Sequence, residues 1–168
     1  MIILVGGTWR TEVAEEFREY AEEVGKALAE KGHILLTGGG TGMSKVVVES
    51  YKKNNGKKYI AMMPCDKVMK EVGEEVGPEP DEFVQEETWD YPIKNIELVK
   101  ASEAVIALPG SLGSLTEVIH AVNDYGKPVA VYDKGPLADM INHISKLKEK
   151  VFLSKDIGKL VDYLEKKE

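Results

Sequence analysis

The segment Pro109–Glu117 carries residue types that suit the binding of a phosphate group, in the order Pro-Gly-Ser-Leu-Gly-Ser-Leu-Thr-Glu. It directly follows the apolar run Ala104–Leu108 and leads into a stretch with helical character. Glycine allows tight turns and a close approach of backbone to ligand, and the unpaired N–H groups at a helix start attract anions. Ser111 and Ser114 add two hydroxyl groups. We therefore predict a phosphate-type site at this segment.

Glu117 is the residue of this segment with chemistry beyond binding. It falls within about the first turn of the predicted helix, where a carboxylate favours the helix dipole. Alternatively, its carboxylate faces the crevice and lies close to a bound sugar. The sequence leaves both readings open.

Two further apolar runs also end in glycines, Gly6-Gly7 and Gly38-Gly39-Gly40-Thr41-Gly42. The second lacks the Lys-Ser/Thr ending of a P-loop and the spacing of a dinucleotide fingerprint. A tight turn between strand and helix would explain any one of these segments, but three of them at the strand ends of one sheet favour a ligand site. The predicted ligand-binding residues are Gly7, Thr8, Gly38, Gly39, Gly40, Thr41, Gly42, Met43, Pro109, Gly110, Ser111, Gly113 and Ser114.

The elements that must position these residues alternate along the chain. Apolar runs predict strands at Ile2–Val5, Ile34–Leu36, Tyr59–Met63, Phe83–Glu86, Ala104–Leu108, Val129–Tyr132 and Val151–Leu153. Helical spacing and breakers predict helices at Thr11–Lys31, Met43–Asn54, Pro92–Ala101, Ser114–Tyr125, Pro136–Lys150 and Asp156–Glu168. This alternation predicts an α/β fold, a Rossmann-like three-layer α/β/α sandwich with a mostly parallel sheet, formed as one domain over residues 1–168.

Several local features refine this prediction. Thr11 is the expected N-cap of the first helix and Gly32 its C-terminal stop. Asp90 precedes Pro92 at a helix start, which favours an N-cap role over a ligand role. The charged segment Lys67–Asp81 is broken by glycines and prolines, and it predicts a surface loop with at most a short helical piece.

Composition excludes several classes of partner. The net charge of −7 over 168 residues disfavours nucleic acid and anionic membrane, and no apolar run has membrane-spanning length. A small anionic ligand remains compatible with this charge, because backbone N–H groups can hold it.

The single Cys65 permits no intrachain disulfide, which suits a reducing cytoplasm. We expect a structural thiol there, with a catalytic thiol as the alternative. The histidines lie far apart, so neither a metal nor another cofactor is predicted.

Four segments together resemble the LOG (Lonely Guy) family. Pro109–Glu117 resembles its Pro-Gly-Gly-x-Gly-Thr-x-x-Glu signature, and Ala101–Leu108 resembles the strand leading into it. Gly38–Met43 resembles the family's first glycine-rich turn, one residue shorter. Asp90–Asn95 resembles its Asp-Met-His-x-Arg-Lys segment, at the same distance before the signature.

The resemblance implies a nucleotide or a related phosphorylated ligand. The family includes phosphoribohydrolases that activate cytokinin nucleotides, and it is similar to the molybdenum cofactor carrier proteins. Hydrolysis of the base–ribose bond of a nucleoside 5′-monophosphate is therefore the leading expectation, and a noncatalytic carrier the alternative. The family's older lysine decarboxylase label is not matched by a recognisable pyridoxal phosphate lysine. The resemblance further implies a homodimer or a higher homo-oligomer.

Carried over residue by residue, the resemblance gives Glu117 the position of the catalytic glutamate. Lys94 stands where the phosphoribohydrolases carry a catalytic arginine, and Asn95 where they carry lysine. Lysine lacks the planar bidentate fork of arginine. Ser111 replaces the second glycine of the signature, and Ser114 replaces threonine while keeping a hydroxyl.

The predicted reaction passes through an oxocarbenium-like transition state. Glu117 would stabilise the charge of this state or activate the attacking water. Lys94 would hold phosphate or assist the leaving base, unless it is an ordinary exposed helix lysine. Arg10 is a candidate for the missing guanidinium, and Trp9 either reaches the crevice or packs on a neighbour. Tyr91 and Trp89 suit either base stacking or a dimer interface.

Overall fold

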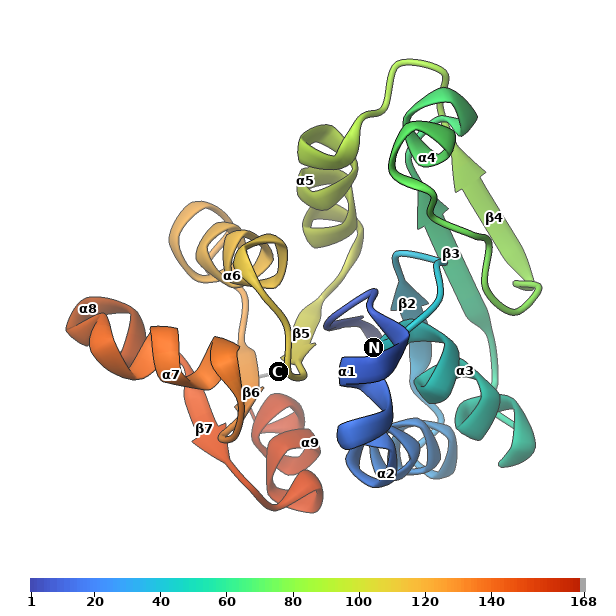
Figure 1. Cartoon of the computed structure of the whole chain (residues 1–168). Helices are drawn as coiled ribbons and strands as arrows, with labels where there is room; N and C mark the ends of the chain where they lie inside the picture. The colour runs from blue at the N-terminus through green and yellow to red at the C-terminus, as the bar shows by residue number, and fades with distance from the viewer. Residues whose placement is uncertain (167–168) are drawn as a thin grey trace.

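The protein forms one parallel sheet of seven strands in the order β4-β3-β2-β1-β5-β6-β7. The structure, a computed structural model, describes residues 1–166 of the chain. Figure 1 shows β4 and β7 at opposite edges of the sheet. The strands are β1 (Ile2–Gly6), β2 (Ile34–Thr37), β3 (Tyr59–Met63), β4 (Glu82–Gln85), β5 (Ala104–Ala107), β6 (Val129–Tyr132) and β7 (Phe152–Ser154).

The order in which strands are added to the sheet reverses between β1 and β5. From β1 it adds β2, β3 and β4 outward on one side, and it then returns to pair β5 with the other side of β1. Gly6 pairs with Ala107 at the carboxyl end of this central pair. Such a switch point is where open α/β sheets bind ligands, because loops from adjacent strands diverge there.

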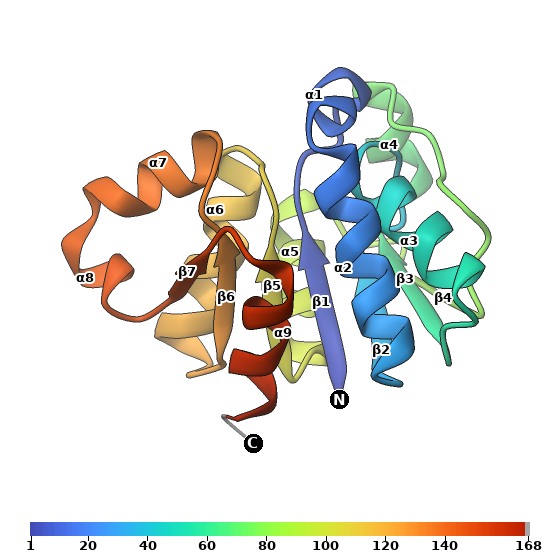
Figure 2. The ribbon, with the colours of Figure 1, turned by 90° about the horizontal axis from the view of Figure 1, so that it is seen from below.

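Helices cover both faces of the sheet. Figure 2 shows α2 and α9 on the near face, with α5 and α6 behind the strands. One apolar core joins the sheet to α1 (Thr11–Glu16), α2 (Arg18–Glu30), α3 (Met43–Lys53) and α9 (Ile157–Glu165). The second joins it to α5 (Tyr91–Ala101), α6 (Leu112–Ile119), the π-helix η1 (His120–Asp124), α7 (Pro136–His143) and α8 (Ser145–Lys148). The predicted three-layer α/β/α sandwich is confirmed.

Within residues 1–166, no helix combines the length and the apolar character needed to cross a bilayer.

The first predicted helix is two helices. Phe17 leaves helical geometry at φ −118° and ψ 17°, and its ring is buried in the core beside α2. The prediction of Thr11 as N-cap is wrong, because Arg10 occupies that position and Thr11 is the first helical residue. Gly32, at φ +70°, ends this region as predicted.

Two other helices differ from prediction in a similar way. The helix expected over Pro136–Lys150 is divided at Ile144, whose ψ of 89° places it outside the helical region. The helix expected from Ser114 begins earlier, at Leu112, and continues as η1 to Asp124, shortly before Gly126, which has φ +60°.

The remaining boundaries follow the prediction closely. The short helical piece expected within Lys67–Asp81 is α4 (Asp66–Val72). The last helix begins after its cap, Asp156, whose side chain accepts from the amide of Lys159. The predicted end of that helix reaches residues 167–168, which lie outside the described residues.

Replacing Gly25 by alanine tests the close packing of α2 on α3. A Cβ on Gly25 would lie 2.9 Å from the backbone nitrogen of Tyr51 and 3.0 Å from the Cβ of Ser50. Because backbone must move, we expect Gly25→Ala to lower the free energy of unfolding by about 1–3 kcal/mol in urea denaturation. The control, Gly158→Ala on the exposed face of α9, should stabilise by up to about 1 kcal/mol. Equal stability of wild type and Gly25→Ala would contradict the close approach.

Candidate functional site

A cavity of about 340 Å³ lies over the carboxyl ends of the central strands. This volume is within the range of small-molecule sites, about 300–1,000 Å³. The turn after β1, the glycine-rich turn after β2, the start of α6 and one face of α5 form its walls. Of the predicted site residues, those lining it are Gly7, Thr8, Gly38, Gly40, Thr41, Lys94, Ser111, Gly113, Ser114 and Glu117.

Backbone hydrogen bonds tie these turns to one another. The amide of Thr8 donates to the carbonyl of Pro109 over 3.0 Å, and the amide of Met43 donates to the carbonyl of Thr8 over 2.8 Å. The amide of Leu108 donates to Gly6 over 2.8 Å. The loops after β1, β2 and β5 therefore form one connected floor beneath the cavity.

The remaining predicted site residues support this floor and do not line the cavity: Gly39, Gly42, Met43, Pro109 and Gly110. Met43 is 1% exposed, and a Cβ on Gly7 would lie 2.8 Å from its Cγ. Gly42, at φ +65°, packs on the backbone of Trp9, where a Cβ would lie 2.5 Å from the carbonyl oxygen. These residues set the shape of the turns, because side chains at the glycine positions would push neighbouring segments apart.

Glu117 contributes a buried carboxyl group to the lining of the cavity. It lies on α6 and is 8% exposed, and its carboxylate rests against the backbone of β1. A Cβ on Gly6 would come within 2.5 Å of Oε2, so only glycine there leaves room for the carboxylate. Burial raises the pKa of Glu117 above its ordinary value, and the nearby ammonium of Lys94 offsets part of this effect. The side chain has no hydrogen-bond partner among the described residues.

Lys94 faces the same cavity from α5. It is 8% exposed, so the alternative of an ordinary exposed lysine is wrong. Its Nζ lies 3.3 Å from the Cβ position of Gly38 and 5.7 Å from the ring centroid of Tyr91. It forms no direct ion pair with Glu117 within residues 1–166, but both side chains line the same cavity and its charge acts on the carboxyl group of Glu117.

The start of α5 is fixed by a cap. Asp90 accepts a hydrogen bond from the amide of Ile93 over 2.9 Å, and Pro92 occupies the first turn. This confirms the N-cap reading of Asp90, which does not line the cavity. Tyr91, Lys94 and Asn95 follow on the same helix and do line it.

Glu74 is a cavity residue that sequence reasoning missed. It follows Gly73, whose φ of +69° ends α4, and its carboxylate reaches over the turn after β2. Tyr91 donates its hydroxyl hydrogen to Glu74 Oε2. Burial and this carboxylate raise the pKa of Tyr91. No periodicity marks Glu74, because Lys67–Asp81 is mostly loop and only the fold brings it above Gly40.

Backbone pairing holds that loop in place. The amide of Gly77 donates to the carbonyl of Gly39 over 2.8 Å, and Val76 forms an antiparallel bridge with Gly40. The loop is thus attached to the glycine-rich turn rather than extended into solvent.

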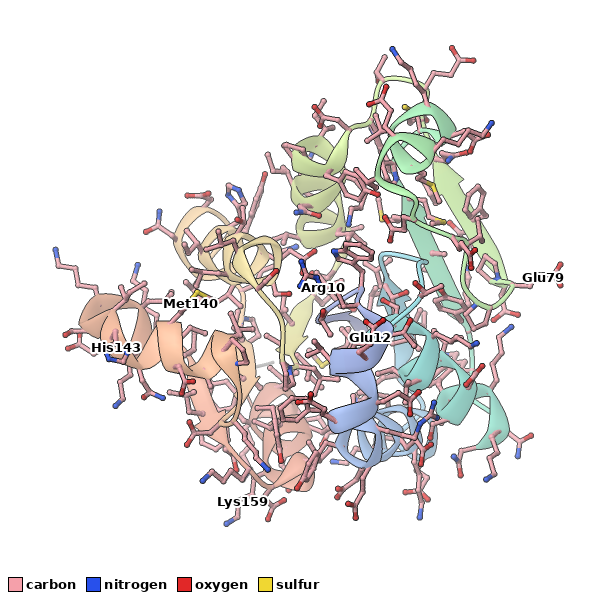
Figure 3. All side chains as sticks on the ribbon, in the orientation of Figure 1. Arg10, Glu12, Glu79, Met140, His143 and Lys159 are labelled. Atoms are coloured by element: carbon pink, nitrogen blue, oxygen red, sulfur yellow. The ribbon has the colours of Figure 1, made fainter. Side chains whose placement is uncertain are left out.

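The aromatic and basic candidates separate into different places. Trp9 is 51% exposed and lines the cavity mouth. Arg10 is exposed and lines a neighbouring depression with Glu12, and Figure 3 shows both near the start of α1. Trp89 packs against the apolar core on the α5 side and does not line the cavity. Cys65 is half-buried and also lies outside the lining.

The chain matches a known family over almost its whole length. Residues 1–161 match the model of the SLOG cluster4 family. A probable cytokinin riboside 5′-monophosphate phosphoribohydrolase of Oryza sativa subsp. japonica is 27% identical over 147 residues, covering 83% of this chain and 56% of that protein. The cytokinin riboside 5′-monophosphate phosphoribohydrolase of Mycobacterium tuberculosis is 32% identical over 124 residues, covering 70% of this chain and 63% of that protein. The resemblance inferred from the motifs is confirmed.

Solved structures show the same fold. The molybdenum cofactor carrier protein of Chlamydomonas reinhardtii superposes with a TM-score of 0.78 at 24% identity, covering 98% of this chain and 96% of that one. The curated relatives are longer than the matched region: the chain spans 56%, 44% and 65% of three of them.

The burial of Glu117 gives a stability prediction. The folded pKa lies above the ordinary value of 4.5, so its contribution to stability is present below that value and is lost as the pH rises through the folded pKa. Glu117→Gln removes the cost of burying the charge. We expect its melting temperature to equal that of wild type near pH 4 and to exceed it increasingly towards pH 8, by about 2–4 °C per kcal/mol.

The matched control is Glu16→Gln, on the exposed end of α1. It removes the same charge without relieving burial, and its melting temperature should follow that of wild type at every pH. A difference in melting temperature between Glu117→Gln and wild type that does not grow from pH 4 to pH 8 would contradict the raised pKa.

Proposed function

The chain belongs to the SLOG cluster4 family, and we propose that its cavity binds a nucleoside 5′-monophosphate and hydrolyses the bond between base and ribose. One observation carries the proposal. Glu117 is a buried carboxyl group without a hydrogen-bond partner among the described residues, and it faces the cavity beside Lys94. A carboxyl group whose pKa is raised by burial and which lines a cavity beside a positive charge is a candidate for a chemical role.

The start of α6 supports a place for the phosphate. The amides of Leu112, Gly113 and Ser114 belong to the first turn, where no intrahelical acceptor exists. Ser111 is the N-cap residue and makes no side-chain capping bond, so its hydroxyl is available to a ligand. Amide dipoles and hydroxyls together favour an anion at this end of the cavity.

The position of Glu117 supports its action on the sugar. In the proposed reaction a water oxygen bonds to C1′ while the bond from C1′ to the base nitrogen breaks. One water proton passes to the Glu117 carboxylate, and the departing base nitrogen takes a proton from the Lys94 ammonium or from solvent; Glu117 then releases its proton, which replaces the one taken up, giving free base and ribose 5-phosphate. A carboxylate with a raised pKa is a stronger base than an ordinary one, and its charge stabilises the oxocarbenium-like transition state.

Lys94 supplies a positive charge on the other side of the reacting atoms. Its ammonium can donate to the departing base or to a phosphate oxygen, as a point charge without the bidentate geometry of arginine. It also offsets part of the effect of burial on the pKa of Glu117, which favours the carboxylate form that accepts the water proton.

A noncatalytic carrier of a phosphorylated ligand is the second candidate. The observation favouring it is Lys94 at the position where the hydrolase resemblance implies arginine. The solved carrier protein with the same fold is consistent with it. The two candidates share the cavity and differ in whether the base is released.

Replacing Glu117 by glutamine tests the catalytic assignment. Wild-type protein incubated with a panel of nucleoside 5′-monophosphates should release free base and ribose 5-phosphate, detected chromatographically. We expect Glu117→Gln to lower kcat by about 10²–10⁴-fold, with little change in ligand affinity, because the amide cannot accept the water proton.

Glu16→Gln is again the control and should retain full turnover. Full activity in Glu117→Gln would remove the catalytic assignment, and ligand binding by wild type without base release would favour the carrier.

Replacing Lys94 tests its electrostatic role. Lys94→Met should move the acid limb of the kcat/KM profile to higher pH, because the pKa of Glu117 rises further without the ammonium. Lys94→Arg should keep the limb near its wild-type position. Lys146→Met, on the exposed surface of α8, provides the control for loss of a positive charge. An unchanged limb in Lys94→Met would contradict the coupling.

A further inference from the structure

Glu74 lies at one end of the cavity, and the start of α6 lies at the other. Glu74 stands over Gly40, in the turn after β2, while Ser114 stands over Gly110, in the turn after β5. In the sheet, β1 separates β2 from β5. The cavity therefore has a carboxylate at the β2 end and a cluster of amides and hydroxyls at the β5 end.

This distribution of charge orients a nucleotide. A carboxylate beside Gly40 repels phosphate, so the glycine-rich turn after β2 is unfavourable for the phosphate despite its composition. The start of α6 attracts phosphate. Glu117 and Lys94 lie between the two ends, against Gly6 and Gly38. With its phosphate over β5 and its C1′ near Glu117, a nucleotide places its base towards Glu74.

Glu74 has hydrogen-bonding capacity left for that base. An ionised carboxylate only accepts hydrogen bonds, and each oxygen has about two acceptor sites. Tyr91 occupies one site on Oε2, while Oε1 has no partner among the described residues. The bond from Tyr91 holds the carboxylate in one orientation. Oε1, beside Gly40, and the second acceptor site of Oε2 therefore have capacity left for N–H donors that lie side by side.

We propose that Glu74, positioned by Tyr91, selects a purine whose edge presents two adjacent N–H donors; this inference rests on the proposed function. Guanine presents such a pair with its N1–H and its 2-amino group. Hypoxanthine keeps only the N1–H donor. Adenine places the acceptor N1 beside its amino group, so an acceptor would face the carboxylate. Buried polar groups left without partners are the strongest source of such discrimination.

Isothermal titration calorimetry with GMP, IMP, AMP and ribose 5-phosphate tests this selection, in proteins that all carry Glu117→Gln so that no nucleotide is cleaved during the titration. For this background with Glu74 and Tyr91 intact, taken as wild type in the comparison below, we expect affinity to fall in the order GMP, IMP, AMP, with at least about a 10-fold difference between GMP and AMP. Ribose 5-phosphate, which has no base, measures binding at the phosphate end alone.

Glu74→Gln changes the acceptor pair into one acceptor and one donor. We expect it to weaken GMP by about 10-fold or more and to strengthen AMP relative to GMP, with ribose 5-phosphate unchanged. Tyr91→Phe should reduce the ratio of the affinities for GMP and AMP, because the Glu74 carboxylate loses its fixed orientation. Glu75→Gln, an exposed neighbour that does not line this cavity, should keep the wild-type order.

The outcomes separate this inference from the proposed function. Equal affinity of wild type for the three purine nucleotides, or an unchanged order in Glu74→Gln, overturns base selection by Glu74 and leaves nucleotide binding standing. Absence of binding by every nucleotide and by ribose 5-phosphate overturns the proposed function itself. If Glu74→Gln does not fold, the order of affinities in the wild-type protein decides.

Discussion

The site depends on the contact between the Glu117 carboxylate and the backbone of Gly6. The contact places a titratable group at the switch point of the sheet and leaves no room for a side chain at Gly6. No hydrogen bond within the described residues compensates for its burial, and the charge of Lys94 is only a partial offset. The surrounding turns keep this arrangement because they are bonded to one another through the backbone.

The cavity brings hydrogen-bond donors, a positive charge and carboxylates together along the carboxyl ends of neighbouring strands. Amides and hydroxyls lie over β5, the two charged side chains lie over β1 and β2, and an acceptor pair lies beyond them. Each position is reached by a short loop from a parallel strand, which is why a small sheet can present several kinds of chemistry within about 340 Å³. In the function that we propose, phosphate binding, reaction and base selection occupy separate parts of one cavity.

Local sequence patterns predicted the layers, the parallel sheet and the cap at Asp90, because these depend on alternation and on residues near one another in the chain. They did not predict the breaks at Phe17 and Ile144, where tertiary packing overrides helical spacing. Glycine composition located the turns but could not distinguish the lining residue Gly40 from the supporting residue Gly39. Glu74 was missed because its position depends on how a loop pairs with a distant turn.

The most direct test of the central claim is the pKa of Glu117 in the ligand-free protein, measured by following its side-chain carboxyl carbon in an NMR titration. We predict a value above the ordinary 4.5, and a higher one still in Lys94→Met. A value at or below 4.5 in the wild-type protein, or no rise on removing the ammonium, would show that neither burial nor Lys94 controls this carboxyl group.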